Sequence, residues 1–267
     1  MSEAVQKPPL PVDGPGLLSG VIDMLDELGT TVMLTGQTLA WTLRRPLRLG
    51  QLVLAMEFIG VQSIFIIALT GTFSGMVLAL QMVHSLRQFQ ADGLVGGIVA
   101  LSLTREISPV FTGLMVTARA GSAWAAELGN MRVTEQIDAI TTMGVSPVQY
   151  LLAPRLWAAV LMVPFLCVVY TSVGMGGAWL VAVEWLHVDP GTFIARAKHD
   201  AFPKDFFMGE IKACAFGFLI AAISCRQGYH ASGGARGVGL ATTRAVVRSA
   251  VAILVANYIL TAWLTPD

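Results

Sequence analysis

The stretch ALSLTREISPVFTGL (residues 100–114) decides how this chain folds, because it places two adjacent charges, Arg105 and Glu106, inside an apolar run. From residue 94 to residue 128 the only other charged side chains are Arg119 and Glu127. Such a run is longer than the ~20 residues that cross a lipid bilayer. The stretch therefore predicts a membrane-spanning helix that carries ionised groups within the bilayer.

The composition of the whole chain also favours a membrane protein. Of its 267 residues, 55% are hydrophobic and 13% are charged, whereas soluble domains carry roughly 25% charged residues. Basic and acidic residues balance at 17 each, so nothing indicates nucleic-acid binding. We predict an all-α, polytopic integral membrane protein.

Five apolar segments are long enough to span the bilayer, within a membrane domain of residues 49–267. These segments are 56–83, 97–126, 150–183, 207–225 and 245–264. Residues 1–16 are rich in proline and glycine and predict a disordered tail. Residues 17–48 predict an amphipathic helix that lies in the membrane interface; a soluble helix packed on a partner is the alternative. The glycine-rich piece 231–244 is expected to be a flexible cytoplasmic connection.

The basic residues and the small residues refine this outline. With the N-terminus inside, eleven Lys and Arg residues fall on the cytoplasmic side and six on the other, which favours a C-terminus outside. Pro109 and Pro164 lie inside spans two and three, and each removes a backbone hydrogen bond. Small residues at i and i+4 allow close helix contact, within one bundle or between two copies. These pairs are Gly71 and Gly75, Gly93 and Gly97, Gly121 and Ala125, and Gly174 and Ala178.

The charged pair in span two needs partners from elsewhere. A charge at the centre of a spanning helix costs at least ~2.5–3.5 kcal/mol, and adjacent residues point about 100° apart, so Arg105 and Glu106 cannot easily neutralise each other. Glu210 and Lys212 enter span four from the same outer side. Our hypothesis is that these four side chains lie close together and surround one polar region of a cavity that opens outward. A static ion pair that fixes helix register is the alternative.

Residues 126–147 predict a short helix at about 130–143, bounded by glycines and a proline. Its apolar residues Val133, Ile137 and Ile140 share one face, while Arg132, Glu135 and Asp138 point elsewhere. The helix is too short and too charged to span a membrane. On the cytoplasmic side it is typical of a helix that docks on a soluble partner or lies on the membrane.

The sequence lacks the motifs of nucleotide-binding and metal-binding proteins. No Gly-Lys dipeptide occurs, so the chain lacks a phosphate-binding loop. The four histidines are isolated and the three cysteines have no paired spacing, which argues against a metal site. We expect a protein that is not an enzyme, with no cofactor of its own, whose energy for any active work comes from another chain.

The continuous run SLTREISPVFTGLMVTARAGSAWAAELGNMRVTEQIDAITTMGVSPVQYLLAPRLWA (102–158) resembles the MlaE family of permeases, which are membrane subunits of ABC transporters that work with MCE proteins. The segments SGMVLALQ (74–81), GYHASGG (228–234) and ATTRAVVRS (241–249) also look like family segments. The resemblance covers nearly all of residues 50–264. It implies a homodimer of five-span subunits, each preceded by an interfacial elbow helix.

The resemblance also implies a function and partners. It implies transport of phospholipid between the inner and outer membranes of a Gram-negative bacterium, which maintains lipid asymmetry of the outer membrane. The partners would be a cytoplasmic ABC ATPase that carries ATP and Mg, a hexameric ring of periplasmic MCE proteins and a small STAS-domain protein. The chain would lie in the inner membrane with its N-terminus cytoplasmic and its C-terminus periplasmic.

Two groups of candidate site residues follow from the charges and the resemblance together. The lipid-cavity group comprises Arg105, Glu106, Lys212, Glu210, Leu78, Leu86 and Phe89, in which the last three are acyl-chain contacts. The ATPase-coupling group comprises Glu127, Arg132, Glu135, Gln136 and Asp138. Two alternative functions stay open: an ion-coupled secondary transporter, which usually shows internal repeats, and a non-transporting scaffold for an ATPase or a periplasmic ring.

Overall fold

The computed structural model describes residues 29–38 and 49–264, which fold into helices joined by short turns with no strand among them. The elements after the helical residues 29–38 are α2 (Leu49–Arg87), α3 (Val95–Ser102), α4 (Ser108–Val116), α5 (Ser122–Val133), α6 (Gln136–Thr142), α7 (Ala153–Trp179), α8 (Pro190–Asp200), α9 (Pro203–Tyr229) and α10 (Gly234–Leu264).

Five helical stretches are long and apolar enough to cross a membrane: Leu49–Arg87, Asp92–Val133, Val148–Trp185, Pro203–Tyr229 and Gly234–Leu264. They contain the five predicted spans, so the described residues confirm an all-α chain with five helices that are candidates to span a membrane. The predicted tail (1–16) and most of the predicted interfacial helix (17–48) lie outside the described residues. The interfacial position of that helix stays a prediction.

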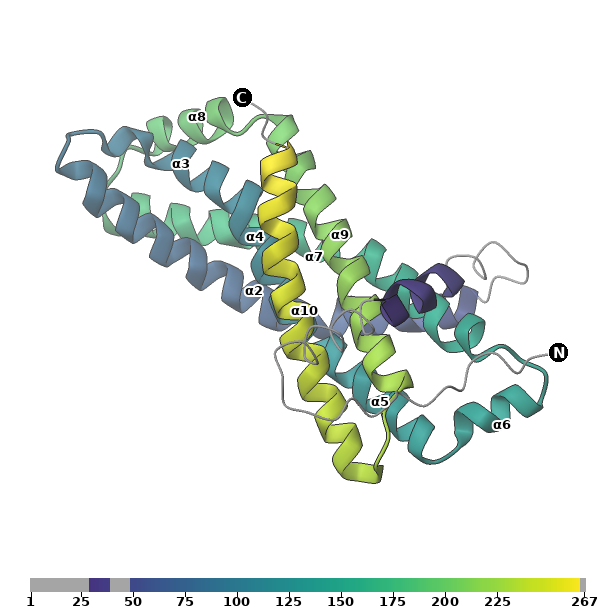
Figure 1. Ribbon diagram of the computed structural model, residues 1–267. Coiled ribbons are helices and arrows are strands. Elements are labelled where there is room, and N and C mark those ends of the chain that lie inside the picture. The colour runs from purple at the N-terminus through teal and green to yellow at the C-terminus, as the bar shows by residue number, and fades with distance from the viewer. Residues whose placement is uncertain (1–28, 39–48, 265–267) are drawn as a thin grey trace, which may run out of the picture.

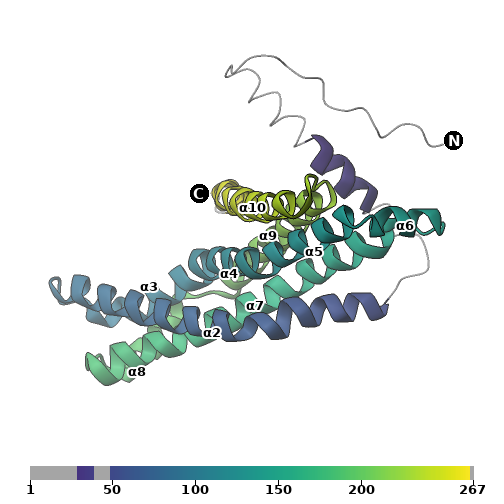
Figure 2. The same cartoon turned by 90° about the horizontal axis from the view of Figure 1, so that it is seen from below.

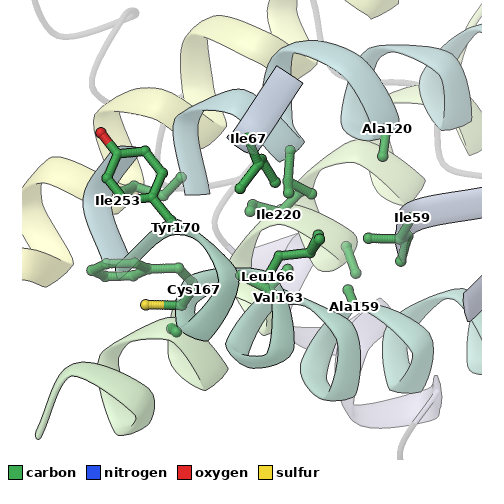
Figure 3. Close-up of a cluster of buried hydrophobic side chains, with 14 of the residues drawn as sticks. Ile59, Ile67, Ala120, Ala159, Val163, Leu166, Cys167, Tyr170, Ile220 and Ile253 are labelled. Atoms are coloured by element: carbon green, nitrogen blue, oxygen red, sulfur yellow. The ribbon is translucent and has the colours of Figure 1, made fainter. Parts of the chain in front are cut away.

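The spanning helices pack in a fixed order across the bundle. In Figure 2, α2 and α10 lie on opposite sides of the molecule, and α7 and α9 lie between them. α2 packs mainly on α7, α7 packs on α9, and α10 packs on both α9 and α5. The centre is filled by apolar side chains from all of these helices, including Ile59, Leu166, Ile220 and Ile253 (Figure 3). α2 and α10 are therefore the helices whose apolar surface faces most outward.

Glycines let α2 and α7 touch backbone to backbone. A Cβ on Gly75 would lie 1.9 Å from the carbonyl oxygen of Gly174, and one on Gly71 would lie 3.0 Å from that of Tyr170. On the second span, a Cβ on Gly97 would lie 1.9 Å from a carboxylate oxygen of Asp200 in α8. For these glycines, close packing within one chain is confirmed. A contact between two copies stays untested.

The second span is continuous but not uniformly α-helical. Its π-helical turns are Leu103–Ile107, which holds Arg105 and Glu106, and Thr117–Gly121, which holds Arg119. Pro109 follows the first of these turns. A proline has no N–H and its ring displaces the carbonyl four residues earlier, and a π-turn accommodates such an interruption. Pro164, in contrast, lies inside α7 without a break in the helix.

Two segments differ from what the sequence predicted. The piece 231–244 was expected to be a flexible connection, but α10 begins at Gly234, so this expectation is wrong for most of the piece. Packing explains the difference, because the start of α10 lies on α5, where Gly129 faces Val238. α8 was not predicted. Its signal was local: Asp189 caps the helix by accepting a hydrogen bond from the Thr192 N–H at 2.7 Å, and Pro190 takes the first position.

Candidate functional site

Glu106 and Lys212 form an ion pair that joins three spans. The Lys212 ammonium lies 2.6 Å from the Glu106 carboxylate and donates a second bond to the Thr261 hydroxyl at 2.8 Å. The Asn257 side-chain amide donates to the other Glu106 oxygen at 3.0 Å. Thr261 also donates to Glu106 at 3.2 Å. We call these four residues the Glu106–Lys212 network. It links the second span, α9 and α10.

The proline of the opening stretch explains the position of Lys212. Pro109 has no N–H, so the carbonyl of Arg105, four residues earlier, loses its usual helical partner. The Lys212 ammonium donates to this carbonyl at 3.0 Å. Lys212 therefore satisfies both the carboxylate beside Arg105 and the backbone group that Pro109 leaves open. This double role explains how a lysine that is 1% exposed is tolerated within the bundle.

Arg105 pairs with a residue that the sequence analysis missed. Its guanidinium donates to Asp205 from Nε at 2.8 Å and from Nη2 at 2.6 Å. The second Asp205 oxygen accepts the backbone N–H of Phe202 at 2.9 Å, at the start of α9. An acidic residue in the first turn of a helix is ordinarily explained by the helix dipole, so the sequence offered no reason to expect a second role.

The four residues of our hypothesis do not all meet. Glu106 and Lys212 are in direct contact, and Arg105 lies beside them with its own counter-ion. Glu210 lies apart from the network, with its carboxylate against the Cys167 thiol of α7. On a helix, residues two apart point to nearly opposite sides, and Lys212 takes the side that faces span two. The expected ring of four is thus corrected to two neighbouring pairs.

The network is enclosed on one side and open on the other. The Lys212 side chain is 1% exposed, whereas that of Glu106 is 39% exposed and that of Arg105 is 35% exposed. Charged groups are thus held firmly at a point where another molecule can reach them. The network joins α10 near its C-terminal end, which lies at the same end of the molecule as α8 (Figure 1).

The candidate acyl contacts lie on the helix that leads to this end. Leu78 and Leu86 are partly buried and pack against the core from α2. Phe89, just after α2, is 77% exposed. Only Phe89 therefore presents most of its ring to the surroundings.

The candidate coupling residues gather at the opposite end, around α6 (Figure 1). Arg132 pairs with Asp138 at 2.7 Å across the turn between α5 and α6, and Glu127 pairs with Arg155 at 2.9 Å. Ile137 is buried and anchors α6. Gln136 and Glu135 are exposed, and Glu135 adopts a left-handed backbone with φ +58°. We call residues 127–142 the α5–α6 bracket; its polar side chains Glu135 and Gln136 point outward. Across the described part of the chain, no cluster of three His, Cys, Asp or Glu side chains is arranged to hold a metal ion.

Comparison with known proteins agrees with this architecture. The profile of the family described as Permease MlaE matches residues 52–263. A probable ABC transporter permease protein of Rickettsia felis is 40% identical over 240 residues, which cover 90% of this chain and 93% of the relative. The intermembrane phospholipid transport system permease protein MlaE of Haemophilus influenzae is 41% identical over 212 residues, or 79% of this chain and 81% of the relative. A cyanobacterial relative, a probable ABC transporter permease protein of Synechocystis, is 38% identical over 238 residues and covers 89% of this chain and 90% of its own length.

The matched residues include nearly all of the five spans, the Glu106–Lys212 network and the α5–α6 bracket. The chain belongs to the MlaE family of permeases.

Proposed function

We propose that this chain is the membrane subunit of an ABC transporter that moves phospholipids between the inner and outer membranes. The observation that carries the proposal is the partly open Glu106–Lys212 network between three spans, in a chain 41% identical to an intermembrane phospholipid transport permease. A phospholipid has a charged head group and apolar tails. A few fixed charges beside an apolar bundle suit that chemistry.

The proposal assigns the two ends of the molecule to two tasks. Arg105, Glu106 and Lys212 meet the lipid head group, while Leu78, Leu86 and Phe89 contact the acyl chains. At the other end α6 and its neighbours dock on a separate ATPase, which binds the ATP and Mg and drives the movement. Two copies of the chain assemble in the inner membrane with the N-terminus cytoplasmic and the C-terminus periplasmic. A ring of MCE proteins and a STAS-domain protein complete the complex.

A reconstituted system tests the proposal against its alternatives. The complex with its ATPase is placed in liposomes, and transfer of a fluorescent phospholipid to an acceptor is followed with and without ATP. We expect transfer that needs both ATP and the ATPase. Transfer by the chain alone, driven by a proton or sodium gradient, would establish a secondary transporter. No transfer, with the ATPase still bound, would establish a scaffold.

Charge reversal on the α5–α6 bracket tests the docking assignment. Glu135 is exposed and makes no ion pair within the described residues, so Glu135→Lys leaves the fold intact. Asp138 is neutralised by Arg132, so Glu135 is the residue that gives this surface its negative charge. A complementary ATPase surface would meet the new lysine with like charge, which weakens docking. We expect the ATPase retained on the purified permease to fall by roughly tenfold or more.

Glu184→Lys is the matched control for this experiment. Glu184 is also exposed but lies at the end of the third span, away from α6. It should retain the ATPase fully. Undiminished co-purification and ATP hydrolysis by the Glu135→Lys protein would contradict the docking assignment.

A further inference from the structure

Arg119, inside the second π-helical turn of span two, is bound by neutral groups. Its Nη1 donates to the backbone carbonyl of Phe58 and to the Ser63 hydroxyl, each at 2.7 Å, and its Nη2 donates to the side-chain carbonyl of Gln62. The guanidinium also lies 4.8 Å from the centre of the Phe58 ring. Among the residues that the structure describes, no carboxylate pairs with Arg119.

The contrast with the other charges of the spans is informative. Arg105 has Asp205, and Lys212 has Glu106. Arg119 keeps a whole positive charge in a segment where charges are costly. A guanidinium has five N–H donors, and the three bonds to α2 leave donors available. Gln62 is exposed, and because its carbonyl oxygen faces Arg119, its amide N–H₂ group is free to donate as well.

The surroundings of Arg119 are apolar and outward-facing. Neighbouring positions on α2, such as Val61 and Phe65, are 64% and 78% exposed. Arg119 itself is partly exposed. The Arg119 cation and the Gln62 amide therefore lie at the edge of an apolar surface, while Ser63, which is 0% exposed, binds the guanidinium from the inner side. A planar guanidinium fork matches the oxygens of a phosphate.

The position of Arg119 along the second span indicates from which leaflet a lipid phosphate could reach it. Arg119 follows Glu106 by 13 residues, which is about 20 Å along a helix. The hydrocarbon core of a bilayer is ~30 Å thick. The two polar sites on this one span therefore lie nearest to opposite leaflets, and Arg119 lies on the side of α5 and α6.

We infer that Arg119 and Gln62, with the guanidinium held in place by the buried Ser63 hydroxyl, form a second anion site, which holds the phosphate of a membrane phospholipid in the leaflet opposite the Glu106–Lys212 network. Acyl chains of that lipid lie along the exposed apolar face of α2. The inference goes beyond the proposed function, because it requires binding of a lipid phosphate and not transport.

Gln62→Glu is the most direct test of the site. The new carboxylate keeps an acceptor for Arg119 and adds a counter-ion where the phosphate would bind, so the fold is preserved. Purified, delipidated protein in a neutral detergent is titrated with short-chain phosphatidylglycerol, and bound lipid is counted by native mass spectrometry. We expect wild-type protein to bind at this site and the variant to bind roughly 10- to 100-fold more weakly, as for loss of a charge-assisted hydrogen bond.

Three further measurements make the result specific. Arg244→Gln removes an exposed arginine of α10 that belongs to neither candidate site and should leave lipid binding unchanged. A diacylglycerol with the same acyl chains has no phosphate, so it should bind the wild-type protein no better than it binds the Gln62→Glu protein. The titrations are repeated with proteins that also carry Lys212→Met. In these proteins, a loss of lipid binding at the Arg119 site is counted separately from lipid binding at the Glu106–Lys212 network.

Each contrary result overturns the inference in a different way. Equal phosphatidylglycerol binding by wild type and Gln62→Glu would show that Arg119 holds no phosphate. Competition by inorganic phosphate at the same concentration as the lipid would assign the site to a soluble anion. Because no transport is measured, failure here leaves the proposed function standing, and failure of transport leaves this site standing.

Discussion

Replacing Glu106 with glutamine should destabilise the protein more than replacing Lys212 with methionine, although both changes break the same ion pair. Removing one partner of a buried pair costs about 3–5 kcal/mol, because it leaves the other charge without compensation. After Glu106→Gln the remaining charge is Lys212, which is 1% exposed. After Lys212→Met it is Glu106, which is 39% exposed and keeps its bonds from Asn257 and Thr261. Glu106→Gln should therefore approach the full cost and Lys212→Met should fall well below it.

The double variant Glu106→Gln/Lys212→Met separates structure from function. It removes both charges, and neutral replacement of a buried pair is often harmless to stability. We expect its thermal unfolding temperature in detergent to lie above that of Glu106→Gln, and to stay below that of the wild type only by the loss of the Lys212 bond to the Arg105 carbonyl, about 1–3 kcal/mol. Phospholipid transfer by the reconstituted complex should stay lost. Normal transfer by the double variant would show that the pair only fixes the position of the helices, which is the alternative that the sequence left open.

Gly75→Ala should force α2 and α7 apart and destabilise the protein. Its methyl group would lie 1.9 Å from the carbonyl oxygen of Gly174 and 2.6 Å from the carbonyl carbon. Overpacking commonly costs about 1–3 kcal/mol when side chains can move. Here the obstacle is backbone, so the two helices must separate, and we expect a loss at or above the upper end of that range. Thermal unfolding of the purified protein in detergent measures it.

Gly176→Ala is the matched control on the facing helix. A Cβ at Gly176 would meet no heavy atom within 4 Å. Since alanine favours a helix over glycine by roughly 0.5–1 kcal/mol, this variant should unfold at the same temperature as the wild type or slightly above it. Equal unfolding temperatures for Gly75→Ala and Gly176→Ala would mean that α2 and α7 do not touch at Gly75.

The sequence by itself determined the fold class and the number of spans. Whether a segment is apolar enough to enter a bilayer depends on the segment alone, so hydropathy located all five helices. The resemblance of residues 102–158 to MlaE permeases was equally local, and the family was recognisable from it. Even the interruption at Pro109 could be expected, because a proline acts on its own helix.

Only the tertiary structure decided which charges meet. Lys212 reaches Glu106 and the carbonyl of Arg105 from a helix more than a hundred residues later, while Glu210 turns to Cys167 and Asp205 takes Arg105. α10 begins at Gly234 because α5 supports it, against the local preference of its glycines. The physical reason is the same in each case: a sequence pattern shows how residues are spaced on one helix, but the partner of a side chain depends on the rotation and depth of the helix that packs against it.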